Sequence, residues 1–261
     1  MTAPIPRDLP DLPAIPRRLA LLPSPVPATA VMAPVRRPLT AAFRLLIALA
    51  AAAGVTIEVL LDSPARALSD FTVQSAVLLA PVLALSARRA RTARRPLPGV
   101  LTGAALLYVV TAALVHHLLL TDAGSPSTST TNAVLPDWAA PLADHTLHTA
   151  VPLAAVLDWL LLTTPGRLHL RQAGTWLLYP LAYLVFSLAR GELPFPGTPP
   201  RYLYPFLDVA QHGYKSVLGN ALLLGLSIYA LAIVLVALDR TRPDPTRQCW
   251  KTGFRLQPPV G

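Results

Sequence analysis

Two histidines lie in an otherwise apolar stretch of the chain, "DHTLHTAVPLAAVLDWL" at residues 144–160. His145 and His148 are three residues apart, so a helix places both on one face. Histidine serves as a general base, as a metal ligand or as a polar residue at an interface, and the spacing leaves all three roles open. A zinc site would need further ligands, for which the chain offers His116, His117, Asp144 and His212. The two-histidine spacing of metalloproteases is absent, so we predict no metal and no other cofactor.

Another apolar run begins with residues that carry hydroxyl groups, in "SDFTVQSA" at residues 69–76. Thr72 and Ser75 share one helical face, and Asp70 or the serine before it is suited to cap the helix. A threonine hydroxyl is a poor nucleophile until a base removes its proton, and histidine is the usual base. Thr72 and His148 are each expected a few residues inside the same membrane surface. A Thr72–His148 pair is therefore one interpretation of these residues.

A third polar segment, "RYLYPFLDVAQHGY", covers residues 201–214. Its aromatic residues, Tyr204 among them, fit an aromatic belt at a membrane surface. Asp208 and His212 are four residues apart and would pair in a helix. Asp208 is also a candidate to orient a catalytic histidine, although nothing in the sequence places it beside one.

Long apolar runs must position these groups. Of the 261 residues, 53% are hydrophobic and 13% charged, and the apolar residues gather in runs of the length that a membrane-spanning helix requires, about 20 residues. We predict an all-α polytopic membrane bundle of six transmembrane helices, at residues 39–61, 71–87, 98–120, 142–162, 173–189 and 216–238. The bundle, residues 39–239, is expected between a proline-rich disordered cytoplasmic tail, residues 1–38, and a basic cytoplasmic tail, residues 240–261.

The positive charge predicts the orientation of these helices. The net charge of +9 comes from arginines beside the apolar runs, so we predict no nucleic-acid partner. Arginines gather in alternate loops, above all in "RRARTARR" at residues 88–95, whereas residues 121–141 contain none. Arginine-rich loops remain in the cytoplasm, which places both termini there and makes 121–137 an outer loop. The composition is typical of a bacterial protein, and we predict a multi-pass protein of the plasma membrane.

The polar residues inside the apolar runs are then expected at one depth, near the outer leaflet. Ionisable groups inside spans are costly and tend to face a cavity or one another, so we expect an outward-facing polar pocket. Asp158 lies ten residues beyond His148, about 15 Å along a helix, which is too far for a hydrogen bond. We predict a structural role for Asp158, paired with Arg171 or a neighbouring hydroxyl. Cys249 is the only cysteine, so an internal disulfide or cysteine metal cluster is impossible.

Prolines inside the predicted spans free backbone carbonyl groups. Pro152 lacks the N–H group that would bond to the carbonyl of His148. In hydrocarbon this oxygen needs a partner from a neighbouring helix or a trapped water, so we expect a kinked helix here. Two further prolines act in the same way on the carbonyls four residues earlier: Pro81 on Val77, and Pro180 on Trp176.

Three motifs taken together, "FTVQS" (71–75), "DHTLHTAVP" (144–152) and "YPFLD" (204–208), resemble a known pattern. The chain resembles the androgen-induced and androgen-dependent family of six-span membrane threonine hydrolases, and more closely its bacterial relatives with prolines in several spans. The resemblance covers residues 40–240. It implies a threonine nucleophile at Thr72 and a histidine at His148, with His145 matching a further histidine of the motif. The "VQS" that follows Thr72 departs from the animal pattern.

The resemblance favours a membrane hydrolase of fatty-acid esters over other interpretations. His148 would deprotonate Thr72, and an acyl chain would reach the site laterally from the bilayer. His145, Ser75 and Tyr204 are candidates to support the reaction by stabilising negative charge, and Asp208 to orient the histidine. The expected partner is a membrane lipid or fatty-acyl ester. Two alternatives remain: a non-enzymatic lipid-binding or scaffolding protein, and a haem or quinone protein that uses His116 or His117 with His148.

Overall fold

A computed structural model describes residues 36–120, 135–192 and 202–243, and all regular structure in these ranges is helical. The proline-rich tail up to residue 35, most of the 121–137 loop, and the basic tail beyond residue 243 with Cys249 lie outside the described residues. The all-α prediction is therefore confirmed for the described part of the chain.

Within the described ranges, five helices are long and apolar enough to cross a membrane. They are α2 (Pro38–Leu61), α4 (Phe71–Arg91), Gly99–Leu120, Ala139–Leu162 and α10 (Val209–Thr241). The third consists of α5 (Gly99–Val115) and the π-helical turn η1 (His116–Leu120). The fourth consists of α6 (Ala139–His145), the π-helical turn η2 (Thr146–Ala150), α7 (Val151–Leu157) and the π-helical turn η3 (Asp158–Leu162). The short helix α3 (Pro64–Ala67) joins α2 to α4.

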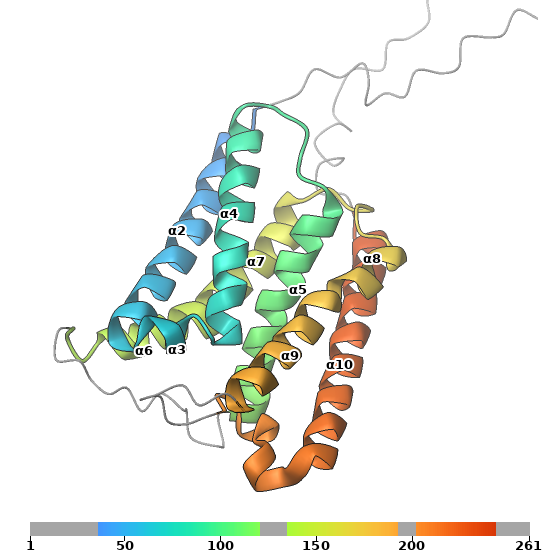
Figure 1. Cartoon of the computed structure of the whole chain (residues 1–261). Coiled ribbons are helices and arrows are strands. Elements are labelled where there is room, and N and C mark those ends of the chain that lie inside the picture. Colours follow the sequence, from blue (N-terminus) through green and yellow to red (C-terminus); the bar gives the residue numbers. More distant parts are fainter. Residues whose placement is uncertain (1–35, 121–134, 193–201, 244–261) are drawn as a thin grey trace, which may run out of the picture. The chain divides into compact units, whose positions relative to one another are not determined.

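The predicted span 173–189 differs, because it is divided into α8 (Leu170–Trp176) and α9 (Leu178–Glu192). The two helices together still run between the two ends of the bundle (Figure 1). The break lies at the carbonyl that Pro180 leaves without a helical partner. The hydroxyl of Tyr108 donates a hydrogen bond of 2.9 Å to this carbonyl of Trp176. The prediction that the freed oxygen finds a partner on another helix is confirmed here.

The approximate boundaries predicted for α4 and α10 differ from those of the structure. Helix α4 continues through the arginines to Arg91, where it was predicted to end at residue 87. Helix α10 begins at Val209 and extends through Thr241, past the predicted start of the basic tail. It is bent at Gly213, whose φ of 70° is readily adopted only by glycine. The continuous part of α10 therefore begins close to the predicted start at residue 216.

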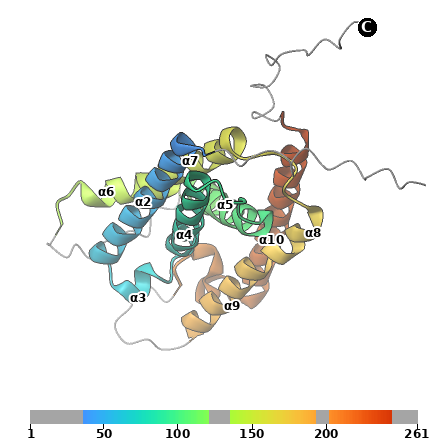
Figure 2. The same cartoon turned by 90° about the horizontal axis from the view of Figure 1, so that it is seen from above.

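The hydrophobic core is formed where α5 packs against the helices around it. Helix α5 packs against α4 and α7 on one side and against α8 and α10 on the other, as Figure 2 shows. An aromatic group ties α9 to this core: the ring of Tyr179 lies 4.7 Å from that of Tyr108 and 5.6 Å from that of Phe71. These contacts hold the start of α4 beside α9.

Buried ion pairs fasten the end of the bundle where α4 ends. Asp158 is paired with Arg44 of α2 at 2.8 Å, and the hydroxyl of Thr163 donates to its backbone oxygen at 3.2 Å. The predicted partner Arg171 was wrong, whereas the predicted neighbouring hydroxyl and the structural role are confirmed. Asp239, at the end of α10, accepts hydrogen bonds from the backbone N–H groups of Arg167 and Leu168. These bonds fix the loop between η3 and α8 against α10.

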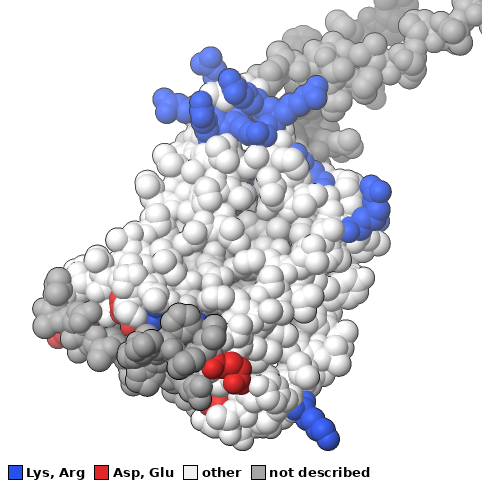
Figure 3. All heavy atoms as spheres, viewed as in Figure 1, with Lys and Arg blue, Asp and Glu red and all other residues white. Residues whose placement is uncertain are grey.

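Charge is distributed unevenly between the two ends of the bundle (Figure 3). Lys and Arg gather at the end where α4 finishes, and Asp and Glu are seen toward the opposite end. Residues 36–37 and 242–243 lie at the basic end, since α2 starts there and α10 finishes there (Figure 1).

Candidate active site

Thr72 is held at the start of α4 by a helix cap. The carboxylate of Asp70 accepts hydrogen bonds from the N–H groups of Thr72 (2.6 Å) and Val73 (3.4 Å), which confirms the predicted cap. Capping satisfies N–H groups that have no partner within the helix. It also fixes the backbone of Thr72, whose side chain is buried and lines a cavity.

The side chains of Thr72 and His148 meet. Nε2 of His148 lies 3.2 Å from Oγ1 of Thr72, although the two residues are 76 positions apart in sequence. Helix α4 and the turn η2 therefore bring a hydroxyl and an imidazole to hydrogen-bonding distance at the end of the bundle opposite the arginines. The two residues that were predicted to lie at the same depth are therefore in contact.

The surroundings of His148 determine which nitrogen carries its proton. Nδ1 lies 3.0 Å from Oδ1 of Asp144 and 3.1 Å from the backbone oxygen of Asp144. Both neighbours are acceptors, so Nδ1 must donate a proton. In the neutral ring Nε2 is then an acceptor, and the hydroxyl of Thr72 donates to it. This is the tautomer that a general base requires.

Asp144 was missed as the residue that orients His148. It had been considered only as a metal ligand, although its spacing of four residues before His148 places both side chains on one helical face. That spacing is the signal that would have found it. Thr72, His148 and Asp144 form a hydroxyl–imidazole–carboxylate chain of the kind that activates nucleophiles in hydrolases.

The turn that carries His148 is supported from α5 and η1. Nε2 of His117 lies 3.2 Å from the backbone oxygen of His148, which is the oxygen left without a helical donor by Pro152. The prediction that this carbonyl finds a partner on a neighbouring helix is confirmed. The ring of His116 stacks on that of His148, with centroids 3.7 Å apart and planes inclined by 18°.

Tyr204 lies in the segment between α9 and α10 and is buried. It lines the same cavity as Thr72 and Phe71. Burial, and next the charge of Asp70, raise the pKa of the Tyr204 phenol well above its usual value. The phenol therefore keeps its proton at neutral pH and remains a hydrogen-bond donor.

Three residues that were predicted to support the reaction have other surroundings in the structure. His145 is exposed and is not among the residues that line the cavity. Ser75 is fully buried, and its hydroxyl donates to the backbone oxygen of Phe71 at 2.7 Å. Asp208 caps α10 by accepting from the N–H groups of Ala210 and Gln211. Asp208 is therefore a helix cap, and the orienting position beside His148 is filled by Asp144 instead.

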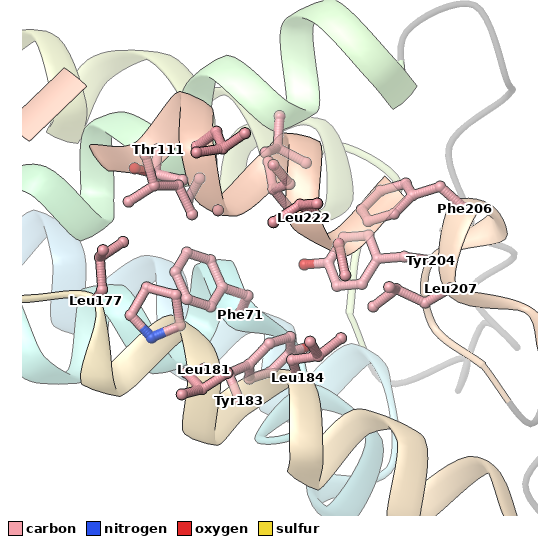
Figure 4. Close-up of a pocket in the computed structure, with 18 of the residues that line it drawn as sticks. Phe71, Thr111, Leu177, Leu181, Tyr183, Leu184, Tyr204, Phe206, Leu207 and Leu222 are labelled. Atoms are coloured by element: carbon pink, nitrogen blue, oxygen red, sulfur yellow. The ribbon is translucent and has the colours of Figure 1, made fainter. Parts of the chain in front are cut away.

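An apolar cavity of about 630 Å³ opens beside Thr72, within the range of ligand-binding pockets. Figure 4 shows Phe71, Tyr204 and Leu222 around this space. Leu181 of α9 and Leu222 of α10 line the cavity and remain 58% and 65% exposed. The exposure of these two side chains shows that the cavity opens between α9 and α10 onto the side of the bundle.

One fully buried hydroxyl in the cavity wall has no hydrogen-bond partner among the described residues. Thr111 of α5 is buried, and its Oγ1 makes no hydrogen bond to any described residue. A buried hydroxyl without a partner is costly. Its presence in the wall favours a ligand that carries a polar group as well as an apolar chain.

Two cofactor interpretations are tested by the geometry. A haem held by His116 and His148 would need its porphyrin between the two rings, and the stacking distance of 3.7 Å leaves no room for one. This pair does not fit a haem. Among the described residues, His116, Asp144 and His148 each offer a ligand atom, and these atoms lie within 4.8 Å of one another.

Comparisons with family models, with curated proteins and with solved structures found no match for this chain. The resemblance to membrane threonine hydrolases therefore rests on the three motifs.

Proposed function

We propose that the chain is a membrane hydrolase of fatty-acyl esters with Thr72 as its nucleophile. The observation that carries this proposal is the chain of contacts from the Thr72 hydroxyl through His148 to Asp144, at 3.2 and 3.0 Å. An acceptor nitrogen facing a buried hydroxyl is the arrangement that removes the proton of a weak nucleophile.

The proposed reaction has two steps. Nε2 of His148 takes the proton of Thr72 while Oγ1 attacks the ester carbonyl. The bond to the leaving alcohol breaks, His148 returns the proton to that oxygen, and an acyl-threonine remains. Water then gives a proton to His148 and attacks the acyl-threonine. The fatty acid departs, and Thr72 recovers its proton.

Two features at the start of α4 support charge stabilisation in these steps. The hydroxyl of Tyr204 belongs to the cavity that Thr72 lines, and we assign it the donation of a hydrogen bond to the developing oxyanion. Thr72 also lies at the N-terminal end of α4, where the helix dipole favours negative charge. The N–H groups of Thr72 and Val73 are occupied by Asp70 and are not assigned to the oxyanion.

The shape and surface of the bundle support a lipid substrate in the membrane. The apolar cavity accommodates an acyl chain, and its opening between α9 and α10 gives lateral access from the bilayer. We take α8 and α9 together as the sixth crossing, with the arginine-rich end in the cytoplasm. The site then lies near the outer leaflet of a bacterial plasma membrane.

A non-enzymatic lipid-binding or scaffolding role is the alternative, and the apolar cavity alone is compatible with it. The alternative gives no reason for the order of Asp144, His148 and Thr72. It predicts lipid binding without turnover, so a turnover measurement separates the two functions.

Hydrolysis of 4-nitrophenyl palmitate by the purified protein in detergent tests the proposal. We expect turnover by the wild type, retention of activity in Thr72→Ser, and loss in Thr72→Ala and His148→Ala. Activity should also fall as the pH is lowered, because a protonated His148 cannot accept the proton of Thr72. His145→Ala is the matched control, since that histidine lies three residues away and is exposed. Equal activity in Thr72→Ala and wild type would contradict the proposal.

A further inference from the structure

Three side chains beside Thr72 have the chemistry of a transition-metal site. Oδ1 of Asp144 lies 3.0 Å from Nδ1 of His148 and 3.7 Å from Nε2 of His116. Tetrahedral zinc with bonds of 2.0–2.1 Å to nitrogen and oxygen places its ligand atoms about 3.3 Å apart. The two observed distances lie on either side of this value, and all three ligand atoms lie within 4.8 Å of one another. The stacked rings of His116 and His148 must turn apart to direct both lone pairs at one ion.

The two histidines come from separate helices and are largely withdrawn from solvent. Their side chains are 14% and 16% exposed, whereas that of Asp144 is 41% exposed. An ion therefore has access along Asp144. His116 begins the π-helical turn η1, and His148 lies in the π-helical turn η2. Such turns occur frequently at functional sites.

The three side chains also match the ligand preference of divalent transition metals. Two imidazole nitrogens and a carboxylate oxygen suit zinc and neighbouring divalent metals.

We propose that His116, Asp144 and His148 bind a divalent transition metal such as Zn²⁺, and that this binding switches off Thr72. The metal needs the lone pair of Nδ1 of His148. The ring keeps one proton, which must then move from Nδ1 to Nε2. Nε2 becomes a donor facing Oγ1 of Thr72 and no longer accepts its proton. The metal also occupies the carboxylate that orients the active tautomer.

Metal binding and inhibition are separate parts of this inference. The site itself is independent of the hydrolase proposal, whereas the inhibition rests on it. The experiment therefore needs one measurement of bound metal and one of nucleophile reactivity on the same samples.

Zinc binding is measured on full-length protein in detergent after chelator treatment. We expect one Zn²⁺ per chain, and at least about tenfold weaker binding in His116→Ala and Asp144→Asn. His145→Ala is the matched control, because it removes an exposed histidine from the same helix. Cys249→Ser tests whether the only thiol contributes. Stoichiometric binding that is unaffected in His116→Ala and Asp144→Asn, or no binding by the wild type, overturns the metal site.

Fluorophosphonate labelling of the same samples tests the inhibition. Zn²⁺ should reduce labelling of the wild type, and a chelator should restore it. In His116→Ala the ratio of labelling with zinc to labelling without zinc should return to about one. Binding that leaves wild-type labelling unchanged overturns the coupling, and labelling that zinc increases shows metal activation instead. No labelling of the zinc-free wild type contradicts the hydrolase and the coupling, while the binding measurement still decides the metal site.

Discussion

The carboxylate of Asp144 decides which nitrogen of His148 faces Thr72. It holds the proton on Nδ1, since the two acceptors near that atom are its own Oδ1 and backbone oxygen. In Asp144→Asn the side chain can offer an N–H group instead, which favours a proton on Nε2. We expect kcat for ester hydrolysis to fall about 10²- to 10⁴-fold, the range that loss of an orienting carboxylate can reach. Asp208→Asn is the control, and an equal loss there would refute the assignment.

The phenol of Tyr204 is expected to act in the transition state more than in substrate binding. Removal of a single oxyanion donor costs about 10²- to 10³-fold in kcat, so Tyr204→Phe should lower kcat by this amount with little change in KM. Tyr202→Phe is the matched control, because that hydroxyl bonds to Glu192 at 3.1 Å. Steady-state kinetics of both variants measures the difference. A rise in KM alone would assign Tyr204 to substrate binding.

The individual residues were predicted from the sequence to different degrees. The contact between Thr72 and His148 was predicted from their depth in two apolar runs and from the resemblance of the three motifs. Asp208 and Ser75 were misassigned because caps and backbone hydrogen bonds satisfy polar side chains locally, and sequence distance does not reveal this. The role of Asp144 follows from helical spacing and could have been predicted.

At the scale of the elements, two prolines act in the same way. Each leaves a backbone carbonyl free, and a side chain of another helix bonds to that carbonyl. The carbonyls freed by Pro152 and Pro180 are met by His117 and by Tyr108. The sequence predicted the free carbonyls correctly. It did not predict that Pro180 would divide a span into α8 and α9. Whether the helix breaks there depends on which side chain of another helix bonds to the carbonyl of Trp176.

The Tyr108 bond can be tested away from the candidate site. Tyr108→Phe leaves the Trp176 carbonyl without its donor and should lower the free energy of unfolding by about 1–3 kcal/mol. In a Pro180→Ala background an N–H group is restored to the helix, so the same substitution should cost less. Thermal unfolding of the four proteins in detergent gives this double-mutant cycle. Equal costs in both backgrounds would show that Tyr108 does not act through this carbonyl.

At the scale of the whole molecule, hydropathy and charge predicted the helical architecture, whereas the cavity could not be predicted. The cavity is formed by residues of α4, α5, α9 and α10 that are distant in sequence. Its volume depends on how far apart α9 and α10 lie, which no local pattern encodes. The uneven distribution of charge between the two ends of the bundle, in contrast, follows directly from the arginines beside the apolar runs.

The proposed orientation predicts which cysteines a reagent can reach. In intact cells Cys249 should resist a membrane-impermeant maleimide, because the tail is predicted to be cytoplasmic. In a Cys249→Ser background, Ser127→Cys should react, because residues 121–137 are predicted to be outside. Permeabilised cells provide the control in which both cysteines react. The reverse pattern would invert the orientation and move the site to the inner leaflet.

Peptide mass spectrometry after fluorophosphonate treatment of the purified protein tests the central claim most directly. The proposed mechanism predicts a covalent adduct on Thr72 of the wild type, with none in His148→Ala protein whose thermal unfolding matches that of the wild type. An adduct on another residue, or a folded wild type that acquires none, would contradict the assignment of Thr72 as a nucleophile activated by His148.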